Sequence, residues 1–305
     1  MSTADVVSPV TTPGEHHAHS GEGHDHGHGH QPHLAHHFES YEQQFDAGKL
    51  GIWLFLVTEV LFFSGLFCAY VVFRVLYPEL FAFGHLFLNK ELGAINTVVL
   101  LVSSLTMALA VRAAQLGQRQ VLISMLVVTI ACAFVFMGIK YVEYTTKFRE
   151  GLFPARYFAP TPEALLHAAH MIHDAQSHGA AGHAAGHGAH DEHAADASHG
   201  HEGKAGDHSH EEVNKNGLTA AEQAMVDSVK VPANAGLFFS IYYCLTGLHG
   251  IHIIAGIAAI SWILVRSIKG HFTPLYFGPV EYVGLYWHLV DLIWIYLFPL
   301  LYLIH

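Results

Sequence analysis

The sequence predicts an all-α polytopic membrane protein, whose core is a bundle of five transmembrane helices. Two properties of the whole chain favour this class, because 52% of its residues are hydrophobic and only 13% are charged. The apolar residues are also concentrated in five long stretches. Each stretch provides the about 20 residues that a helix needs to cross a bilayer. Small residues such as Gly65, Ala69, Gly247 and Gly256 recur in them, which is typical of closely packed membrane helices.

The five predicted spans alternate with polar segments. The spans are expected at residues 50–76, 92–114, 121–144, 235–267 and 280–303. The domain organisation is then a disordered His-rich segment at 1–48, three helices within 49–150, a His-rich polar insert at 151–234 and two helices within 235–305. The His-rich segments contain too few large apolar residues to pack a core, so they are predicted to be disordered. Two short helices are expected inside the insert, at 162–174 and 218–229.

Basic residues in the short loops predict the orientation of these spans. Cytoplasmic loops carry an excess of Lys and Arg. Five basic residues fall on one side of the membrane, namely Lys49, Arg112, Arg119, Arg266 and Lys269. This excess predicts a cytoplasmic N-terminus, with the insert and the C-terminus outside. The N-terminal segment lacks a basic stretch followed by a short apolar run, so no cleavable signal peptide is expected.

Charge and cysteine usage argue against several classes of function. Lys and Arg together number 14 and form no dense basic patch, which argues against nucleic acid as a partner. Cys68, Cys132 and Cys244 lie in three separate spans without a CxxC neighbour. Neither a disulfide framework nor a thiolate metal site is therefore predicted.

Glu59 is the most unusual single residue, because it is a carboxylic acid in the middle of the first span. Ionisable groups at membrane depth are costly and are by default candidates for function. Glu59 could relay protons. It could instead tie its helix to a neighbour through a hydrogen bond, with His252 or Thr246 as the expected partner, and this structural role is the favoured one.

Glu143 lies near the end of the third span and is the second candidate acid. A carboxylate near the membrane interface can reach water, or it can pair with Lys140 or Lys147 on the same helix. The position favours a solvated residue at the end of the helix, with a proton-related role as the alternative.

Four further polar residues lie within the last two spans. His249 and His252 share one helical face, and His288 and Asp291 share another through the same spacing of three residues. Such a set could hold a haem iron or copper, but it lacks a known ligand spacing. We expect these residues to serve helix packing, with no metal bound in the membrane.

Three basic residues follow the fourth span, namely Arg266, Lys269 and His271. Basic residues at a membrane face attract anionic lipid head groups and also determine topology. Both roles are predicted for these residues.

The His-rich tracts are candidates for weak metal binding, because imidazole suits zinc, copper and nickel. The residues concerned are His24, His26, His28, His30, His199, His201, His208 and His210. The alternative, a solvated tether without a bound metal, is favoured.

Four motifs occur together in one order along the chain. Residues 49–66 contain Thr58-Glu59-Val60-Leu61-Phe62-Phe63, and residues 96–104 begin with Asn96-Thr97. Residues 246–252 read TGLHGIH, and residues 286–294 read YWHLVDLIW. These stretches resemble subunit III of the haem–copper cytochrome c oxidases, and the resemblance covers residues 49–150 and 235–303.

The resemblance implies an accessory, non-redox subunit of an aerobic terminal oxidase that reduces oxygen to water and pumps protons. The implied partners are subunits I and II and membrane phospholipid, with haem and copper held by the partner subunits. Glu59 and Glu143 match acids of the family, and Arg266, Lys269 and His271 match residues that meet lipid head groups. The implied role is to stabilise the catalytic subunit and support proton uptake, in the inner membrane of a bacterium.

The chain also departs from the family. Members often have seven spans, and this chain matches the last five, while the long insert replaces a short loop. Two alternatives stay open. The chain could be subunit III of a quinol oxidase, or, in a different class, a transition-metal transporter with a His-rich loop. A lone membrane anchor would not explain the polar helix faces.

Overall fold

The computed structural model of the protein describes residues 38–184 and 217–303. All regular elements in this part of the chain are helices, which confirms the all-α fold class. The α-helices are α1 (Tyr41–Leu76), α2 (Pro78–His85), α3 (Lys90–Gln115), α4 (Arg119–Arg149), α5 (Pro162–Ala184), α6 (Ala220–Ser228), α7 (Gly236–Ile268) and α8 (Gly278–Phe298). A 3-10 turn, η1 (Ala155–Tyr157), and a π-helical turn, η2 (Pro299–Leu303), complete the set.

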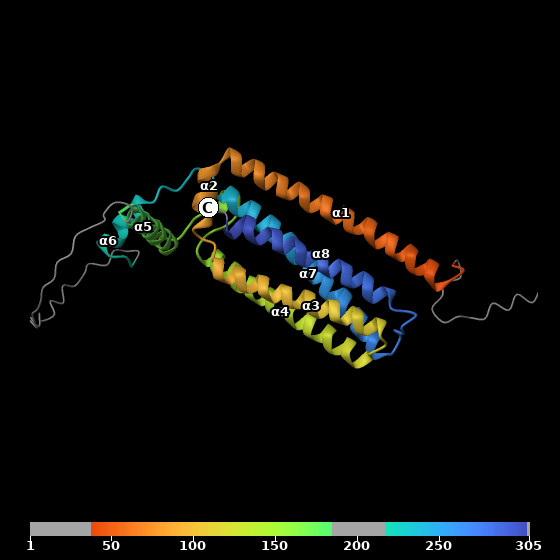
Figure 1. Ribbon diagram of the computed structural model, residues 1–305. Coiled ribbons are helices and arrows are strands. Elements are labelled where there is room, and N and C mark those ends of the chain that lie inside the picture. Colours follow the sequence, from red (N-terminus) through yellow and green to blue (C-terminus); the bar gives the residue numbers. More distant parts are fainter. Residues whose placement is uncertain (1–37, 185–216, 304–305) are drawn as a thin grey trace, which may run out of the picture.

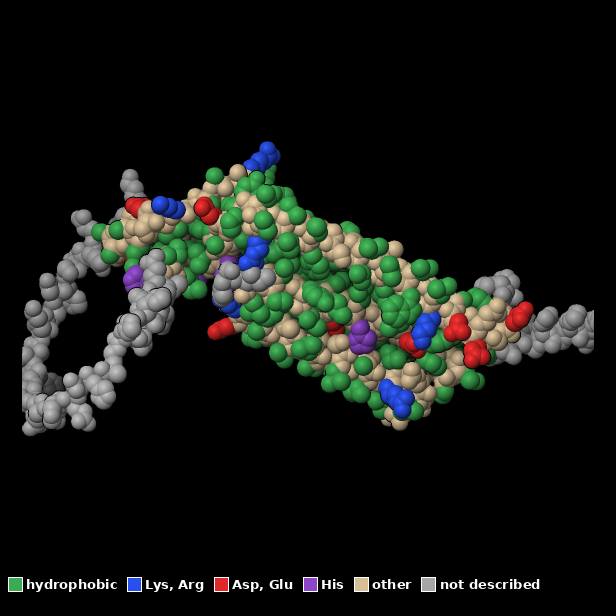
Figure 2. All heavy atoms as spheres, turned by 45° about the horizontal axis from the view of Figure 1, so that its top comes forward, with side chains coloured by type: hydrophobic (Ala, Val, Ile, Leu, Met, Phe, Trp, Pro, Cys, Tyr) green, Lys and Arg blue, Asp and Glu red, His purple; other side chains and the backbone are tan. Residues whose placement is uncertain are grey.

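Within the described residues, five helices are long and apolar enough to cross a membrane. They are α1, α3, α4, α7 and the continuous stretch of α8 and η2. The five predicted spans are thereby confirmed. Figure 2 shows hydrophobic side chains over much of the length of the bundle, with most charged side chains toward its two ends.

Four of the spans form a compact bundle, and the fifth lies at its edge. Helices α3, α4, α7 and α8 pack against one another, whereas α1 packs chiefly along α8. Figure 1 shows α1 well separated from α3 and α4. Only 11% of the apolar window of α1 is buried, compared with 39% for α8 and η2. Most of the surface of α1 is therefore left for lipid or for a partner.

The first helix begins earlier than the sequence predicted. Ser40 caps it by accepting a hydrogen bond from the amide of Gln43, and α1 starts at Tyr41. The expected disordered segment 1–48 is therefore wrong for residues 41–48. The apolar pattern misses these residues because they are polar and lie on an extension of the span. The rest of that segment, up to residue 37, lies outside the described residues.

Large aromatic residues of α8 hold the bundle together. Trp287 is fully buried and packs on Gly256 of α7, where a Cβ atom would lie 2.6 Å from the indole ring. Its indole nitrogen donates to the hydroxyl of Ser103 on α3 at 3.0 Å. Two helical turns further along α8, Trp294 donates to the hydroxyl of Thr97 on α3 at 3.1 Å. Small residues and hydroxyls on α3 and α7 thus receive the rings of α8.

The two ends of the bundle are closed differently. At the end where α1 begins, Tyr282 donates to the carbonyl of Phe45, and Arg119 donates to the last carbonyls of α7 at Ser267 and Ile268. The end of η2 lies at the opposite end, beside α2 (Figure 1). The described termini thus lie at opposite ends of the bundle, as an odd number of spans requires.

The insert contributes α5 and α6, which project beyond the bundle (Figure 1). Both short helices predicted in the insert are confirmed, although α5 continues to Ala184. A capping box begins α6, since Thr219 accepts from the amide of Glu222 and Glu222 accepts from the amide of Thr219. The part of the insert at 185–216, predicted to be disordered, lies outside the described residues.

Candidate functional site

A carboxyl and an imidazole join α1 to α7 within the membrane-spanning part of the molecule. Oxygen Oε2 of Glu59 lies 2.9 Å from Nε2 of His252. Each of the two side chains is 18% exposed. The predicted contact of Glu59 with His252 is confirmed. Thr246, the other expected partner, instead bonds to the hydroxyl of Tyr144 and the carbonyl of Tyr242.

The tautomer of His252 follows from its second contact. Its Nδ1 lies 2.7 Å from the carbonyl oxygen of Leu248. A carbonyl oxygen can only accept, so Nδ1 carries a hydrogen. Nε2 therefore either accepts a hydrogen bond from a protonated Glu59 carboxyl or donates a hydrogen bond to the Glu59 carboxylate. The pair can hold one proton between the two groups in either arrangement.

Aromatic rings surround this pair. The ring of Phe63 lies 5.1 Å from the imidazole of His252, with an edge-on orientation, and the ring of Phe62 lies 6.4 Å from it. Tyr286 of α8 donates its hydroxyl to the backbone carbonyl of His252 at 3.2 Å. These rings pack on the imidazole side of the contact. They also connect α1, α7 and α8 at this level.

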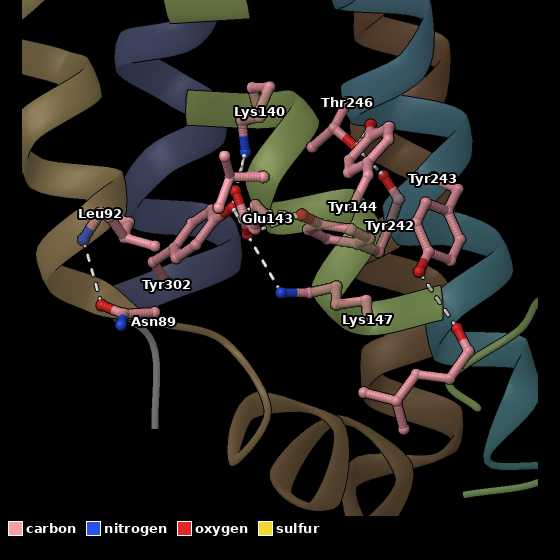
Figure 3. Close-up of polar contacts among 12 residues, drawn as sticks. Asn89, Leu92, Lys140, Glu143, Tyr144, Lys147, Tyr242, Tyr243, Thr246 and Tyr302 are labelled. Atoms are coloured by element: carbon pink, nitrogen blue, oxygen red, sulfur yellow. Dashed lines mark hydrogen bonds and ion pairs between the residues drawn. The ribbon is translucent and has the colours of Figure 1, made fainter. Parts of the chain in front are cut away.

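Glu143 lies at the centre of a second polar cluster, shown in Figure 3. Its Oε2 accepts from Lys140 at 2.7 Å. Its Oε1 accepts from Lys147 at 3.2 Å, from Tyr242 at 2.8 Å and from Tyr302 at 2.6 Å. Four donors thus converge on one carboxylate, which is only 3% exposed.

The predicted solvent exposure of Glu143 is therefore wrong. Its position along α4 suggested water, but Tyr242 of α7 and Tyr302 of η2 cover it. Lys140 is buried as well, donates to the hydroxyl of Tyr302 at 2.8 Å and lies 4.5 Å from the centre of the Trp294 ring. The two lysine partners were considered from the sequence. The two tyrosines were missed, because nothing in the local sequence connects them with Glu143.

The cluster leads toward the surface through Lys147. A cavity of about 680 Å³ is lined by Glu143, Lys147, Glu150 and, from α5, His167, among others. Glu150 follows the last residue of α4. Burial raises the pKa of the Glu150 carboxyl, and the charges of Lys147 and His167 oppose that shift. Acidic and basic side chains thus alternate from the bundle interior to the insert.

The other predicted site residues of α7 and α8 are His249, His288 and Asp291, and each has its own neighbours. His249 is fully buried between Phe136 and Trp294, at ring distances of 5.7 Å and 5.3 Å. Nδ1 of His288 lies 2.7 Å from the hydroxyl of Ser104 on α3. Asp291 is 3% exposed, and its carboxyl interacts with the side chain of Ser104 on α3. The structure therefore places His249 and His252 against different neighbours.

No metal centre is formed by these groups. Among residues 38–184 and 217–303, no group of three or more His, Cys, Asp or Glu side chains is placed to hold a metal ion. The candidate weak metal residues at His24–His30 and His199–His210 lie outside the described residues. Their metal binding stays a prediction.

The three basic residues predicted to meet lipid lie at the C-terminal end of α7. The guanidinium of Arg266 stacks between aromatic rings, 5.0 Å from the centre of Trp262 and 5.7 Å from that of Phe272. Lys269 is the exposed C-cap residue, and the amide of His271 donates to the carbonyl of Arg266 at 3.1 Å. The stacking fixes one cation at the interfacial end of the span.

Comparison with known proteins identifies the family. The family model for cytochrome c oxidase subunit III matches residues 35–182 and 221–305, which is most of the chain. This chain belongs to the cytochrome c oxidase subunit III family. The family match includes all five spans, and it leaves out most of the His-rich tracts.

Individual relatives match this chain over different lengths. A probable cytochrome c oxidase subunit 3 of Mycobacterium bovis is 38% identical over 80 residues, covering 26% of this chain and 38% of the relative. Cytochrome c oxidase subunit 3 of Synechocystis is 46% identical over 69 residues, covering 22% of this chain and 30% of the relative. A heme-copper oxidase subunit I+III of Aeropyrum pernix is 22% identical over 265 residues, covering 85% of this chain and 23% of the relative. The chain thus spans less than half of the length of these relatives.

Proposed function

We propose that this chain is the accessory, non-redox subunit III of an aerobic terminal oxidase that reduces oxygen to water and pumps protons. Its partners would be the catalytic subunit I and subunit II, which would hold the haem and copper. The observation that carries this proposal is the family match over residues 35–182 and 221–305, which runs through every predicted span. The Aeropyrum relative, named as a fused subunit I+III, supports a close association with subunit I.

The Glu59–His252 pair supports a proton-related role for the subunit. The carboxyl oxygen and the imidazole nitrogen lie 2.9 Å apart, which is close enough for a proton to pass between them, and both side chains are partly exposed. Proton transfer between such groups requires the short contact that is observed here. In this proposal the pair supports proton uptake by the complex, and the buried Glu143 cluster maintains the shape of the bundle. This assigns different roles to the two acids.

Lipid binding is proposed at the end of α7. Arg266, Lys269 and His271 lie at one end of the span, where phosphate groups of lipids would meet them. The aromatic stacking of Arg266 supports this role, because it holds the guanidinium at a fixed height along the helix. We place this end on the cytoplasmic side of a bacterial inner membrane, following the distribution of basic residues in short loops.

The proposal is tested by purifying the tagged full-length chain from its host membranes in a mild detergent. We expect haem absorbance to accompany it, together with oxygen consumption driven by cytochrome c or by a quinol. The choice of donor distinguishes a cytochrome c oxidase from a quinol oxidase. A haem-free chain that carries zinc into vesicles would overturn the proposal in favour of a metal transporter.

A further inference from the structure

The cavity next to Lys147 is large enough for a ligand and has no part in the function proposed above. Its volume is about 680 Å³, and ligand pockets typically measure about 300–1,000 Å³. Residues of four segments line it: the end of α2 with the loop that follows, the start of α3, the end of α4 and the first part of α5. We call it the Lys147 cavity. It lies at the end of the bundle opposite to the C-terminal end of α7 (Figure 1).

The ammonium of Lys147 is buried but has few acceptors, because its side chain is only 4% exposed. An ammonium carries three N–H donors. Among the described residues Lys147 makes one hydrogen bond, to Oε1 of Glu143 at 3.2 Å. That oxygen also accepts from Tyr242 and Tyr302 over shorter distances of 2.8 Å and 2.6 Å. Unsatisfied buried donors of a charged group are costly, so the other donors of Lys147 indicate a further acceptor inside the cavity.

Lys140, the other ammonium bonded to Glu143, differs in this respect. It donates to Glu143 at 2.7 Å and to the hydroxyl of Tyr302 at 2.8 Å, and it lies 4.5 Å from the centre of the Trp294 ring. It is not among the residues that line the cavity. The need for a further acceptor is therefore found at the lysine that borders the cavity. In Figure 3 the side chain of Lys147 extends from α4 toward the side on which Asn89 lies, and Asn89 also lines the cavity.

Charged side chains of both signs line the rest of the Lys147 cavity. Lys90 adds a second ammonium, and Glu91 and Glu150 add two carboxyl groups. Glu150 interacts electrostatically with Lys147 but forms no ion pair with it in the described part of the chain. A ligand with negative charge alone would be repelled by the two carboxylates, whereas a zwitterion can place each of its charges near an opposite one. The lining therefore favours a zwitterionic ligand.

The cavity reaches the outer surface of α4. Val142, which is 57% exposed, and Thr146, which is exposed as well, line it from this helix. Both residues belong to the last two turns of a span, where lipid head groups surround a membrane protein. Apolar residues complete the lining, namely Leu86, Phe87, Leu92 and Met171. A lipid could thus enter from the side with its head group toward Lys147.

We propose that the Lys147 cavity binds the head group of a zwitterionic phospholipid, with its phosphate on the Lys147 ammonium and its amine on the side of Glu150. Lysine is a common phosphate ligand, and phosphate oxygens supply the acceptors that Lys147 lacks. Basic pockets between membrane helices are known to hold lipid head groups. The site lies at the other end of the bundle from Arg266, and it involves neither Glu59 nor His252.

The first test measures the lipid that the full-length chain retains. The chain is purified with its bound partners in lipid-free detergent, and retained phospholipid is quantified by mass spectrometry. Lys147→Met removes the ammonium and leaves Lys140 paired with Glu143, so we expect the variant to fold but to lose phospholipid that the parent keeps. Lys147→Arg keeps the charge and should retain it. Equal retention by the parent and Lys147→Met would overturn the proposal.

The matched control is Arg149→Gln, which removes a positive charge two residues further along α4. Arg149 is exposed and does not line the cavity, so this variant should retain phospholipid like the parent. Loss of phospholipid in both Lys147→Met and Arg149→Gln would show a general effect of charge and would overturn the assigned site.

The second test identifies the source of the phosphate. The thermal midpoint of the same preparations is measured with added short-chain phosphatidylethanolamine or with sodium phosphate. We expect the lipid to raise the midpoint of the parent more than that of Lys147→Met. A rise with inorganic phosphate alone would overturn the lipid as the ligand. A structure of the parent in its complex that shows only water within hydrogen-bond distance of Lys147 would overturn the phosphate site itself.

Discussion

Glu59 and Glu143 both lie in membrane-spanning helices, but they differ in the number of their hydrogen-bond partners and in their burial. Among the described residues Glu59 bonds to one side chain, His252, and it is 18% exposed on the loosely attached α1. Glu143 accepts from four donors, and its side chain is 2% exposed inside the four-helix bundle. The comparison teaches that an acid in a span can be an adjustable contact or a structural centre. The number of fixed donors distinguishes the two cases.

The largest effect is expected when the structural centre is disrupted. Glu143→Gln would leave Lys140 and Lys147 buried without a counter-charge. Breaking a buried ion pair from one side typically costs about 3–5 kcal/mol. We expect the variant to accumulate poorly and to unfold at a much lower temperature, measured on the full-length chain in detergent.

The matched control is Glu150→Gln, which changes the same residue type two turns further along the chain. Its carboxyl forms no ion pair within the described part of the chain and is only partly buried, so loss of its charge should have little effect. Equal losses for the two variants would contradict the special position of Glu143.

A smaller effect is expected at Glu59. Glu59→Gln keeps a group that can hydrogen-bond to His252, so the loss should be below about 1 kcal/mol, as for an ordinary hydrogen bond. We expect assembly to remain largely intact, measured as the amount of chain that co-purifies with haem. Oxygen consumption at several pH values would then report any proton-related role. Complete loss of assembly would instead favour a purely structural role.

A local effect is expected in α6, outside the bundle. Thr219→Ala removes the hydroxyl that accepts from the amide of Glu222, while the amide of residue 219 still donates to the Glu222 carboxylate. Loss of such a cap typically costs about 1 kcal/mol of helix stability. Hydrogen bonds with Thr219 lower the pKa of Glu222 below its ordinary value of 4.5. The stabilisation is therefore present above the ordinary value and is lost as the pH falls through the lowered one.

Amide exchange over Ala220–Ser228 measures this effect, and the difference between parent and variant should shrink in acid. Ser228→Ala is the control, because Ser228 bonds at the other end of α6 to the carbonyl of Met225. A difference that grows in acid would contradict the assigned role of Glu222.

The smallest effect is expected for deletion of residues 176–212. These residues lie beyond the part of α5 that lines the cavity next to Glu143, where the last contributing residue is Met171. If the removed segment is a tether, oxygen reduction by the purified complex should stay near normal. A copper-dependent drop in activity would instead assign the segment a role in metal binding.

The spans could be predicted from the sequence because apolar length alone specifies them. The short helix α2 could not, since Pro78–His85 is eight residues long and continues the apolar character of the preceding span. The contact between Glu59 and His252 was predictable because few polar residues exist at that depth. The burial of Glu143 was not, because Tyr242 and Tyr302 are far away in the sequence and only the packing of α7 and η2 brings them there.

The polar residues of α7 and α8 show a second limit of sequence analysis. Asp291 and His249 stand out as polar residues in apolar spans, so a special environment was expected. The pattern suggested mutual packing, but the structure directs each residue to a different set of neighbours.

The attachment of α1 to α8 has a consequence for biosynthesis. The first span leaves the ribosome long before its principal packing partner, since residues 77–277 separate the two helices. During that interval α1 must rest in the bilayer by itself, held by its apolar length. Domains generally form in the order of synthesis, and late partners are a source of misassembly. The first helix therefore packs into the bundle only at the last step of membrane insertion, when α8 is in place. In truncated chains that lack α8, α1 should not pack against the other spans.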